Sequence, residues 1–237
     1  EAFKKVTELN PNYADGFNNL GIILKDQDKL DEALEAYKKA LYIKPDYAEV
    51  YNNMGNAFKY QSKLEKAIEA YNRAISLKPD YAEAYYNMGT TFKNQEKLDK
   101  AIEAYKRALS IKPDYVEAYN NMGVAFGKQN RFDEAILAYN KAISINSDYA
   151  EVYNNMGVIF HKQIKLDEAT DAYQNAILLE PTNTVYWNNL AYSMLLIKDN
   201  KPVSENILSD LQKEKKSVIQ EINLNILKYK IFRSENI

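Results

Sequence analysis

The six residues VYNNMG at positions 50–55 recur letter for letter at positions 152–157. Near copies stand before, between and after them, as FNNLG at 17–21, YYNMG at 85–89, YNNMG at 119–123 and WNNLA at 187–191. Self-similarity at a fixed period is the signature of a repeat architecture, in which one small unit is written several times. The chain therefore has to be read as copies of one unit before any single segment is interpreted.

Four residue types follow the same 34-residue period. Each type occupies its own column, and the copies of one column differ by 34 in residue number. The columns are Pro11, Pro45, Pro79, Pro113 and Pro181 (with Ser147 at the one missing place), Gly21, Gly55, Gly89, Gly123 and Gly157, Ala33, Ala67, Ala101, Ala135 and Ala169, and Tyr37, Tyr71, Tyr105, Tyr139 and Tyr173.

Each unit reads as two helices. Tyr51, Met54 and Phe58 have the spacing of one helix face, and the run from Leu64 to Ile75 has the same period. The glycine within the first helix is expected to let the second helix approach closely, at a propensity cost of roughly 1 kcal/mol. An aspartate such as Asp46, with a glutamate three residues later, is expected to cap the first helix.

Composition excludes several classes of function. The 237 residues carry 31 Lys and Arg against 33 Asp and Glu, so there is no basic field to gather nucleic acid. The absence of cysteine excludes disulfides, thiolate metal sites and a cysteine nucleophile. No apolar run reaches the roughly 18 residues of a membrane span, and no signal peptide is visible. We expect a soluble protein with no membrane insertion and favour an intracellular one, although the compartment stays unknown.

The period and its motif, Y-x2-M-G-x2-F followed by Ala, Tyr, Ala and Pro, resemble the tetratricopeptide repeat. The resemblance implies an all-α fold, a right-handed superhelical solenoid of antiparallel helix pairs whose first helices line a concave groove. It covers five full repeats over residues 14–183. Residues 1–13 then supply the second helix of a preceding partial repeat, in which Phe3 and Val6 fall in the Tyr37 and Ala40 columns.

Residues 184–237 form a degenerate sixth repeat and C-terminal capping helices in this interpretation. Trp187 and Leu190 open the sixth unit, but Val203 stands where the small alanine is expected. The segment 217–232 has helical apolar spacing and is expected to cover the last open face, because a repeat array needs polar caps at its ends. The alternative is a helix that binds a partner or forms a dimer.

An asparagine column raises the question of function. At about 100° per residue, Asn53 projects from the side of its helix opposite the apolar face of Tyr51 and Phe58. Its column, called the amide row below, consists of Asn19, Asn53, Asn87, Asn121, Asn155 and Asn189. In the resembled fold this column points into the groove.

A row of amides can hold the N–H and C=O groups of an extended peptide without reading its side chains. Such a row most closely resembles the asparagine ladder in the helical domain of O-GlcNAc transferase, which implies binding of extended protein segments. The alternative is a set of solvated residues copied by duplication. The neighbouring column receives less weight in this interpretation, because Tyr86 interrupts its asparagines Asn18, Asn52, Asn120, Asn154 and Asn188.

Other residues are expected to line the same groove. Asn56 joins the candidate peptide-binding set, as does the lysine row of Lys25, Lys59 and Lys93, which shares its column with His161. The glutamates at the opposite edge are Glu49, Glu83, Glu117 and Glu151, and the apolar residues of the Asn56 column are Ile22, Val124, Val158 and Tyr192. A clamp for a chaperone-tail carboxylate is an open alternative for the lysines. At roughly 8 to 10 Å per helix and about 3.3 Å per residue, the groove would span about 12 to 15 peptide residues.

No catalytic arrangement is visible. His161 is the only histidine, so neither a histidine metal site nor a Ser-His-Asp triad forms without it. We expect no enzyme, no cofactor and no metal. The groove glutamates repeat at the same period as the scaffold residues, which argues against an acid–base pair.

Three functions remain open. The first is a noncatalytic module that binds an extended or disordered protein segment. The second is the substrate-recruiting region of a larger glycosyltransferase, since Glu1 matches Glu35 in the period and the chain opens inside a helix without Met, as a fragment would. The third is a structural part of an assembly or a homo-oligomer, joined through the convex face or the C-terminal helix.

Overall fold

A computed structural model describes residues 12–196. In this part of the chain the regular structure is entirely α-helical, and each helix is 13 or 14 residues long. The helices are α2 (Ala14–Asp26), α3 (Leu30–Ile43), α4 (Ala48–Tyr60), α5 (Leu64–Leu77), α6 (Ala82–Asn94), α7 (Leu98–Ile111), α8 (Val116–Lys128), α9 (Phe132–Ile145), α10 (Ala150–Lys162), α11 (Leu166–Leu179) and α12 (Thr184–Leu196).

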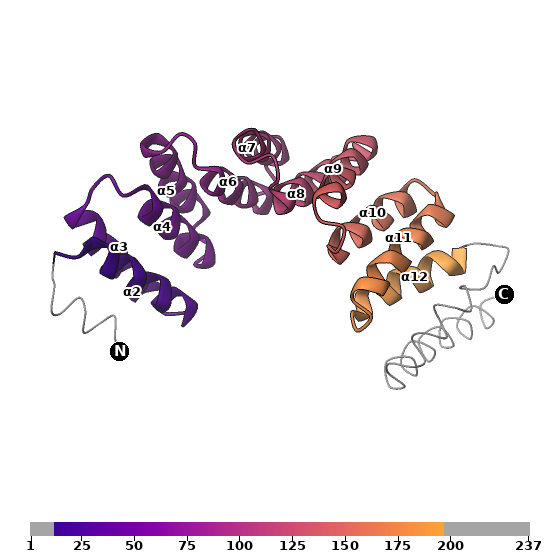
Figure 1. Ribbon diagram of the computed structural model, residues 1–237, viewed down its shortest axis with the longest axis horizontal. Helices are drawn as coiled ribbons and strands as arrows, with labels where there is room; N and C mark the ends of the chain where they lie inside the picture. The colour runs from indigo at the N-terminus through magenta and orange to yellow at the C-terminus, as the bar shows by residue number, and fades with distance from the viewer. Residues whose placement is uncertain (1–11, 197–237) are drawn as a thin grey trace. The chain divides into compact units, whose positions relative to one another are not determined.

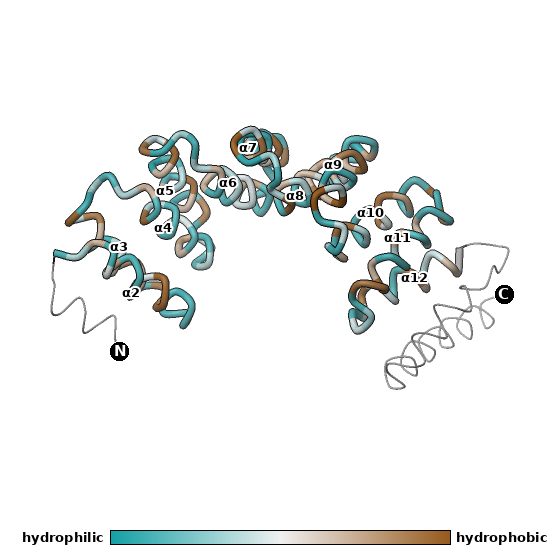
Figure 2. The backbone as a smooth tube through the Cα atoms, viewed as in Figure 1, coloured by the Kyte–Doolittle hydropathy of each residue, from teal (hydrophilic) through white to brown (hydrophobic). Residues whose placement is uncertain are grey.

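The helices pair in sequence order, α2 with α3, α4 with α5, α6 with α7 and α10 with α11. Hydrophobic and hydrophilic residues are mixed along each helix (Figure 2), as expected of elements that bury one stripe and expose the other. None of the helices between residues 12 and 196 combines the length and apolarity that crossing a membrane requires. The predicted fold class, an all-α solenoid of helix pairs, is confirmed.

The chain divides into two compact units, residues 1–125 and 126–237, with the division inside α8. In the first unit, α2 contacts α4 and α4 contacts α6, so the first helices of successive pairs form one layer (Figure 1). The second helices α3, α5 and α7 form the other layer. In the second unit, α12 contacts both α10 and α11.

Four pairs, α2–α3, α4–α5, α6–α7 and α10–α11, are held together by a tyrosine lying on a glycine. Tyr37, Tyr71 and Tyr105 of the second helices are fully buried. A Cβ placed on Gly21 would lie 2.4 Å from the Tyr37 ring, and one on Gly55 would lie 2.5 Å from the Tyr71 ring. No real Cβ sits so close to a fixed ring, so only glycine lets the helices approach this far. The predicted packing role of the glycine is confirmed.

The hydroxyl groups of these tyrosines meet different partners. Tyr71 donates a hydrogen bond of 2.8 Å to Oδ1 of Asn56, whereas the hydroxyl of Tyr37 has no hydrogen-bond partner among the described residues. The residue of the first pair that corresponds to Asn56 is Ile22, which has no acceptor to offer. The difference between the two pairs therefore follows from one substitution in the repeat.

The prediction that an aspartate such as Asp46 caps the first helix of a pair is wrong. Helix α4 begins at Ala48, so its N-cap is Tyr47 rather than Asp46, and no side chain caps it. The Tyr47 carbonyl accepts from the N–H groups of Val50 and Tyr51 at 3.1 and 3.3 Å. The ammonium of Lys44 lies 4.3 Å from the centre of the Tyr47 ring, and the pairs Lys78–Tyr81 and Lys112–Tyr115 repeat this cation–π contact.

A left-handed residue ends the first helix of each pair. The N–H of Lys29 donates to the carbonyl of Leu24 and that of Asp28 to the carbonyl of Lys25, both at 2.9 Å, the bonding of a Schellman motif. Glycine is the usual residue at this place, but here it is occupied by others. The left-handed residues, with φ between 57° and 61°, are Asp28, Ser62, Glu96, Asn130 and Ile164.

Helix α12 supplies the first helix of the sixth unit. Trp187 and Leu190 are buried against Tyr173 and Ile177 of α11, and the indole N–H of Trp187 donates to the Pro181 carbonyl at 3.0 Å. The expectations for Phe3, Val6, Val203 and the helix at 217–232 lie outside the described residues.

Candidate functional site

The amide row lies on the first helices of the pairs. Asn19, Asn53, Asn87 and Asn121 belong to the first unit, and Asn155 and Asn189 to the second. All six side chains are partly buried. They are thus neither packed away in the core nor simply solvated.

The amide row joins successive repeats. In the first unit, Nδ2 of Asn53 donates to Oδ1 of Asn18 at 2.9 Å, and Nδ2 of Asn87 donates to Oδ1 of Asn52 at 3.0 Å. In the second unit, Nδ2 of Asn189 donates to Oδ1 of Asn154 at 2.8 Å. Each bond connects residues 35 positions apart, which means one repeat plus one residue. The asparagine is therefore held in its place partly by the fold.

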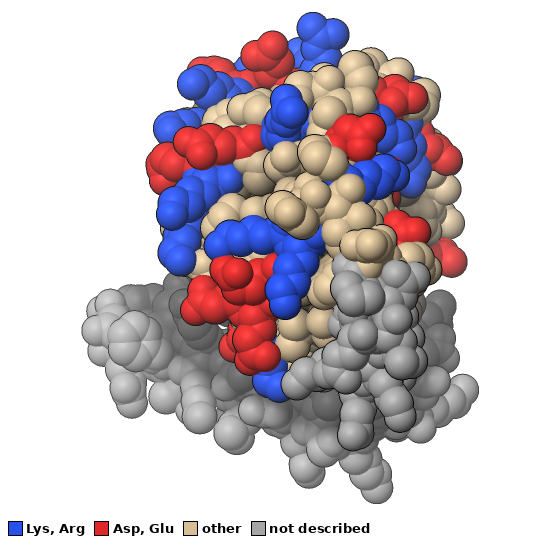
Figure 3. Space-filling view, turned by 90° about the vertical axis from the view of Figure 1, so that its left-hand side faces the viewer, with Lys and Arg blue, Asp and Glu red and all other residues tan. Residues whose placement is uncertain are grey.

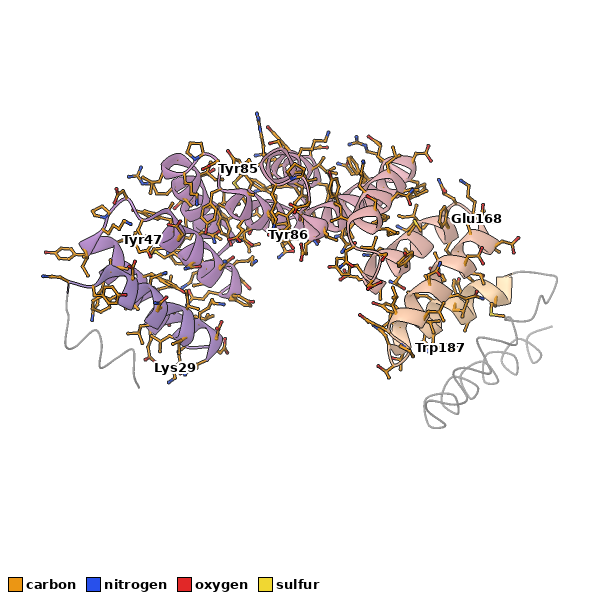
Figure 4. The ribbon with its side chains drawn as sticks, viewed as in Figure 1. Lys29, Tyr47, Tyr85, Tyr86, Glu168 and Trp187 are labelled. Atoms are coloured by element: carbon orange, nitrogen blue, oxygen red, sulfur yellow. The ribbon has the colours of Figure 1, made fainter. Side chains whose placement is uncertain are left out.

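Tyr86 continues this pattern although it is not an asparagine. Nδ2 of Asn121 donates to the Tyr86 hydroxyl at 2.9 Å. Figure 4 shows Tyr85 and Tyr86 leaving α6 in different directions, and the Tyr86 ring lies 4.8 Å from that of Tyr115. A hydroxyl oxygen accepts a hydrogen bond as an amide oxygen does, so Tyr86 takes the place of the asparagine as the acceptor of this inter-repeat bond.

The accepting column was given too little weight in the sequence interpretation. Asn18, Asn52, Asn120 and Asn154 are each at most 8% exposed, and only Asn188 of this column is exposed. A buried amide oxygen without a partner is costly, so the bond from the next repeat matters for stability. This column is structural, and the amide row is the more accessible of the two.

The inter-repeat bond uses only part of each amide. A side-chain amide has two N–H donors and an oxygen with two acceptor positions. One N–H is committed in Asn53, Asn87 and Asn189. The other N–H and the oxygen remain as groups that a partly exposed side chain can offer to a ligand.

Asn56 and the lysine row differ in their surroundings. Asn56 accepts from the buried Tyr71, so its oxygen is committed to the fold. Lys25 pairs with Asp26 at 2.7 Å, and Lys93 donates to Oδ1 of Asn121. Burial lowers the pKa of Lys59, and the positive charges of Lys25 and Lys93 lower it further.

The expected glutamate edge is partly neutralised. Glu49 lies 3.6 Å from the ammonium of Lys78, and both side chains are close to half exposed. On the side of the molecule that carries α2 and α3, Lys and Arg are interspersed with Asp and Glu (Figure 3). Surface ion pairs of this kind stabilise by at most about 1 kcal/mol.

His161 of the second unit has a specific partner. Its Nδ1 lies 2.8 Å from Oγ of Ser193, and its ring stacks on that of Tyr192 with centres 5.0 Å apart. Ser193 is fully buried, so this pair does not form an accessible nucleophile. Residues 12–196 contain no cluster of acidic residues and histidine that could bind a metal. Sequence reasoning missed the pair because its members lie 32 residues apart.

Family models cover most of the chain. A TPR repeat model matches residues 23–62, 55–96, 89–130 and 125–163, and two tetratricopeptide repeat models match residues 2–35 and 150–183. The chain belongs to the tetratricopeptide repeat family. The helix pairs, the Gly–Tyr contact and the 34-residue period described above are thus tetratricopeptide repeats.

Solved structures show the same fold. MamA is 28% identical at a TM-score of 0.63, and the match covers 70% of this chain and 97% of MamA. YrrB, described as a TPR protein with an unusual peptide-binding site, is 23% identical at a TM-score of 0.63, covering 79% of this chain and 97% of YrrB. A chain of the APC/C hetero-tetramer Cut9–Hcn1 is 17% identical at a TM-score of 0.69, covering 93% and 44%.

No curated protein sequence matches the chain. The resemblance of the amide row to that of O-GlcNAc transferase thus remains a prediction. What the family shows is a protein-interaction module.

Proposed function

We propose that this chain is a noncatalytic module that binds an extended protein segment along the part of its amide row that lies in the first unit, Asn19, Asn53, Asn87 and Asn121. The proposal rests on the observation that Asn53 and Asn87 each use only part of their hydrogen-bonding capacity within the fold. Each gives one N–H to the preceding repeat and is still partly exposed. A residue needed only for packing would be expected to be fully buried.

The inter-repeat bond also prepares the amides for binding. A hydrogen-bonded side chain has already lost rotamer freedom, so less entropy is lost when it takes a ligand. The free N–H and oxygen match the two main-chain groups that every peptide unit offers. Binding by such groups depends little on the ligand's side chains. The site would therefore favour extended segments over folded surfaces.

The fold is compatible with this function. YrrB has the same fold and a peptide-binding site, which supports the proposal at the level of architecture alone. Within the first unit, three helix steps of roughly 8 to 10 Å each, at about 3.3 Å per extended residue, correspond to about 7 to 9 peptide residues, so a twelve-residue probe is long enough.

The test uses random twelve-residue peptides displayed on phage and selected on the full chain. The peptide that binds most tightly is then synthesised. Its affinity for the parent, for Asn19→Ala and for Asn53→Ala is measured by fluorescence anisotropy. Loss of one hydrogen bond, about 0.5–1.5 kcal/mol, would weaken binding about threefold to tenfold. Asn72→Ala is the matched control, because Asn72 is an exposed residue on α5 of the second-helix layer.

The variants Asn19→Ala and Asn53→Ala differ in their effect on the fold. Asn19 makes no hydrogen bond with the described residues, so its replacement tests binding without breaking an inter-repeat bond. Asn53→Ala breaks one and is measured well below its melting temperature. A failure to select any peptide, or equal affinities for the parent and Asn19→Ala, would contradict the proposal.

A further inference from the structure

The lysine row of the first unit concentrates positive charge beside the amide row. Lys25, Lys59 and Lys93 stand at the same position of α2, α4 and α6, and all three are partly buried. Their charges interact, because Lys25 and Lys93 both lower the pKa of Lys59. Like charges held together in a partly desolvated place repel one another.

The described residues leave the charge of Lys59 poorly neutralised. Lys59 has no carboxylate within ion-pair distance in the part of the chain that the structure describes. The Asp26 carboxylate that pairs with Lys25 is 63% exposed, so solvent screens it. Lys93 donates to a neutral amide oxygen of Asn121.

The glutamates of the same helices are too far away to compensate. Glu49 precedes Lys59 by ten residues on α4, which corresponds to about 15 Å along the helix axis. That separation exceeds the Debye length of about 8 Å at physiological ionic strength. Glu49 is moreover paired with Lys78. An anion from outside the chain would relieve the repulsion, whereas a cation would increase it.

We infer that the peptide segment bound by the first unit is acidic, and that its side-chain carboxylates pair with Lys25, Lys59 and Lys93. This inference rests on the proposed peptide-binding function. The row ends within the first unit, because the next place in the column is Gly127 and the one after is His161. The acidic stretch of the ligand therefore lies over α2, α4 and α6 only.

The spacing of the lysines fixes the spacing of the carboxylates. Neighbouring helices lie roughly 8 to 10 Å apart, and three residues of an extended chain span about 10 Å. One carboxylate in every three residues would meet each lysine in turn. Side chains as long as those of Lys and Glu tolerate the difference between these two lengths.

The experiment compares two versions of the peptide selected above, which differ only in Glu or Gln at the acidic positions, both with blocked ends. Phage selection is run on the parent and on Lys59→Gln/Lys93→Gln. We expect acidic residues to be enriched on the parent and not on the variant. The Glu peptide should bind the parent at least tenfold more tightly than the Gln peptide at 50 mM salt, and the gap should shrink at 500 mM salt.

The matched control is Lys106→Gln, which makes the same charge change at an exposed residue of α7 and should leave the Glu preference intact. Peptides selected without acidic enrichment, or equal binding of the Glu and Gln versions, would overturn this inference while leaving the proposed function in place. Selection of no peptide at all would overturn both. A Glu preference that survives in Lys59→Gln/Lys93→Gln would show that other residues carry it and would overturn the assignment.

Discussion

The side-chain amide of Asn87 donates a 3.0 Å hydrogen bond to the buried oxygen of Asn52, 35 residues earlier in the chain. The same relationship joins Asn53 to Asn18 and Asn189 to Asn154. It explains why asparagine, a mediocre helix former, stands at positions 53, 87 and 189. The side chain serves the contact between repeats and keeps donor and acceptor capacity for a ligand.

Removing this bond should destabilise the protein. Asn87→Ala leaves the oxygen of Asn52, a residue 4% exposed, without its donor, which costs about 1–3 kcal/mol. Asn19→Ala is the control, because Asn19 donates to no described residue, and we expect a change below about 0.5 kcal/mol. Urea denaturation followed by circular dichroism gives the two midpoints. Equal midpoints would show that the inter-repeat bond contributes nothing.

Two glycines should respond differently to the same substitution. In Gly55→Ala the new Cβ would lie 2.5 Å from the ring of Tyr71, which is fully buried and hydrogen-bonded, so we expect a loss of about 1–3 kcal/mol. In Gly127→Ala the Cβ meets the terminal Cδ1 of Ile159 at 2.6 Å, and its only other neighbour is Cγ1 of the same side chain at 3.8 Å. That methyl can turn away, and alanine gains up to about 1 kcal/mol of helix propensity. Thermal melts that shift equally would contradict the packing argument.

Ile164 is a site where stability can be gained. Its φ is 61°, which costs an L-residue roughly 1–2 kcal/mol and a β-branched one most of all. The side chain is 81% exposed, so little burial is lost with it. Ile164→Gly should stabilise by about 1 kcal/mol in a thermal melt, and Asn130→Gly should have a smaller effect because asparagine tolerates φ near 60°. A destabilised Ile164→Gly would refute this explanation.

Alkaline pH should unfold the protein through its buried tyrosines. Burial raises the pKa of Tyr81 and of Tyr173 to about 12, and Glu83 and Glu49 add to the shift at Tyr81. An unfolded tyrosine ionises near pH 10. A tyrosine whose pKa is raised by folding stabilises the folded state fully below about pH 10, where it is protonated in both states. This stabilisation is lost as pH rises through 12, because the unfolded state releases its proton first.

Melting temperatures between pH 9.5 and 11.5, read by circular dichroism, measure this loss. We expect a steady fall with pH, and a shallower one in Tyr173→Phe, which removes one such group. A melting temperature that stays constant across this range would contradict the predicted linkage.

The periodic columns made the helix pairs and the Gly–Tyr contact predictable. Gly55 and Tyr71 both lie on the side of their helix that carries the apolar residues, so a helical period on each element was sufficient. The positions of the helix ends were harder to predict from the sequence. Asp46 followed by Glu49 resembles a capping box, yet the chain turns one residue later, at Tyr47, whose ring is covered by Lys44.

The contacts between repeats could not be read from one helix. Asn52 seemed less informative because Tyr86 breaks its column, but the hydroxyl of Tyr86 accepts from Asn121 as the amide oxygen of Asn52 accepts from Asn87. A helix projection shows how Asn52 and Asn53 lie around one helix. It does not reveal that Asn52 accepts a hydrogen bond from Asn87, 35 residues later, on another helix. The pair of His161 and Ser193 was missed for the same reason.

The most direct measurement is an N-methyl scan of the selected twelve-residue peptide. Each synthetic version replaces one main-chain N–H by N–CH₃ and leaves all side chains unchanged, so it removes a donor that the amide oxygens of the row could accept. Affinities come from isothermal titration at fixed salt. If the amide row holds the main chain, N-methylation at regularly spaced positions will weaken binding by about tenfold or more, corresponding to about 1.4 kcal/mol each. Unchanged affinity at every position would show that the row does not bind the peptide backbone.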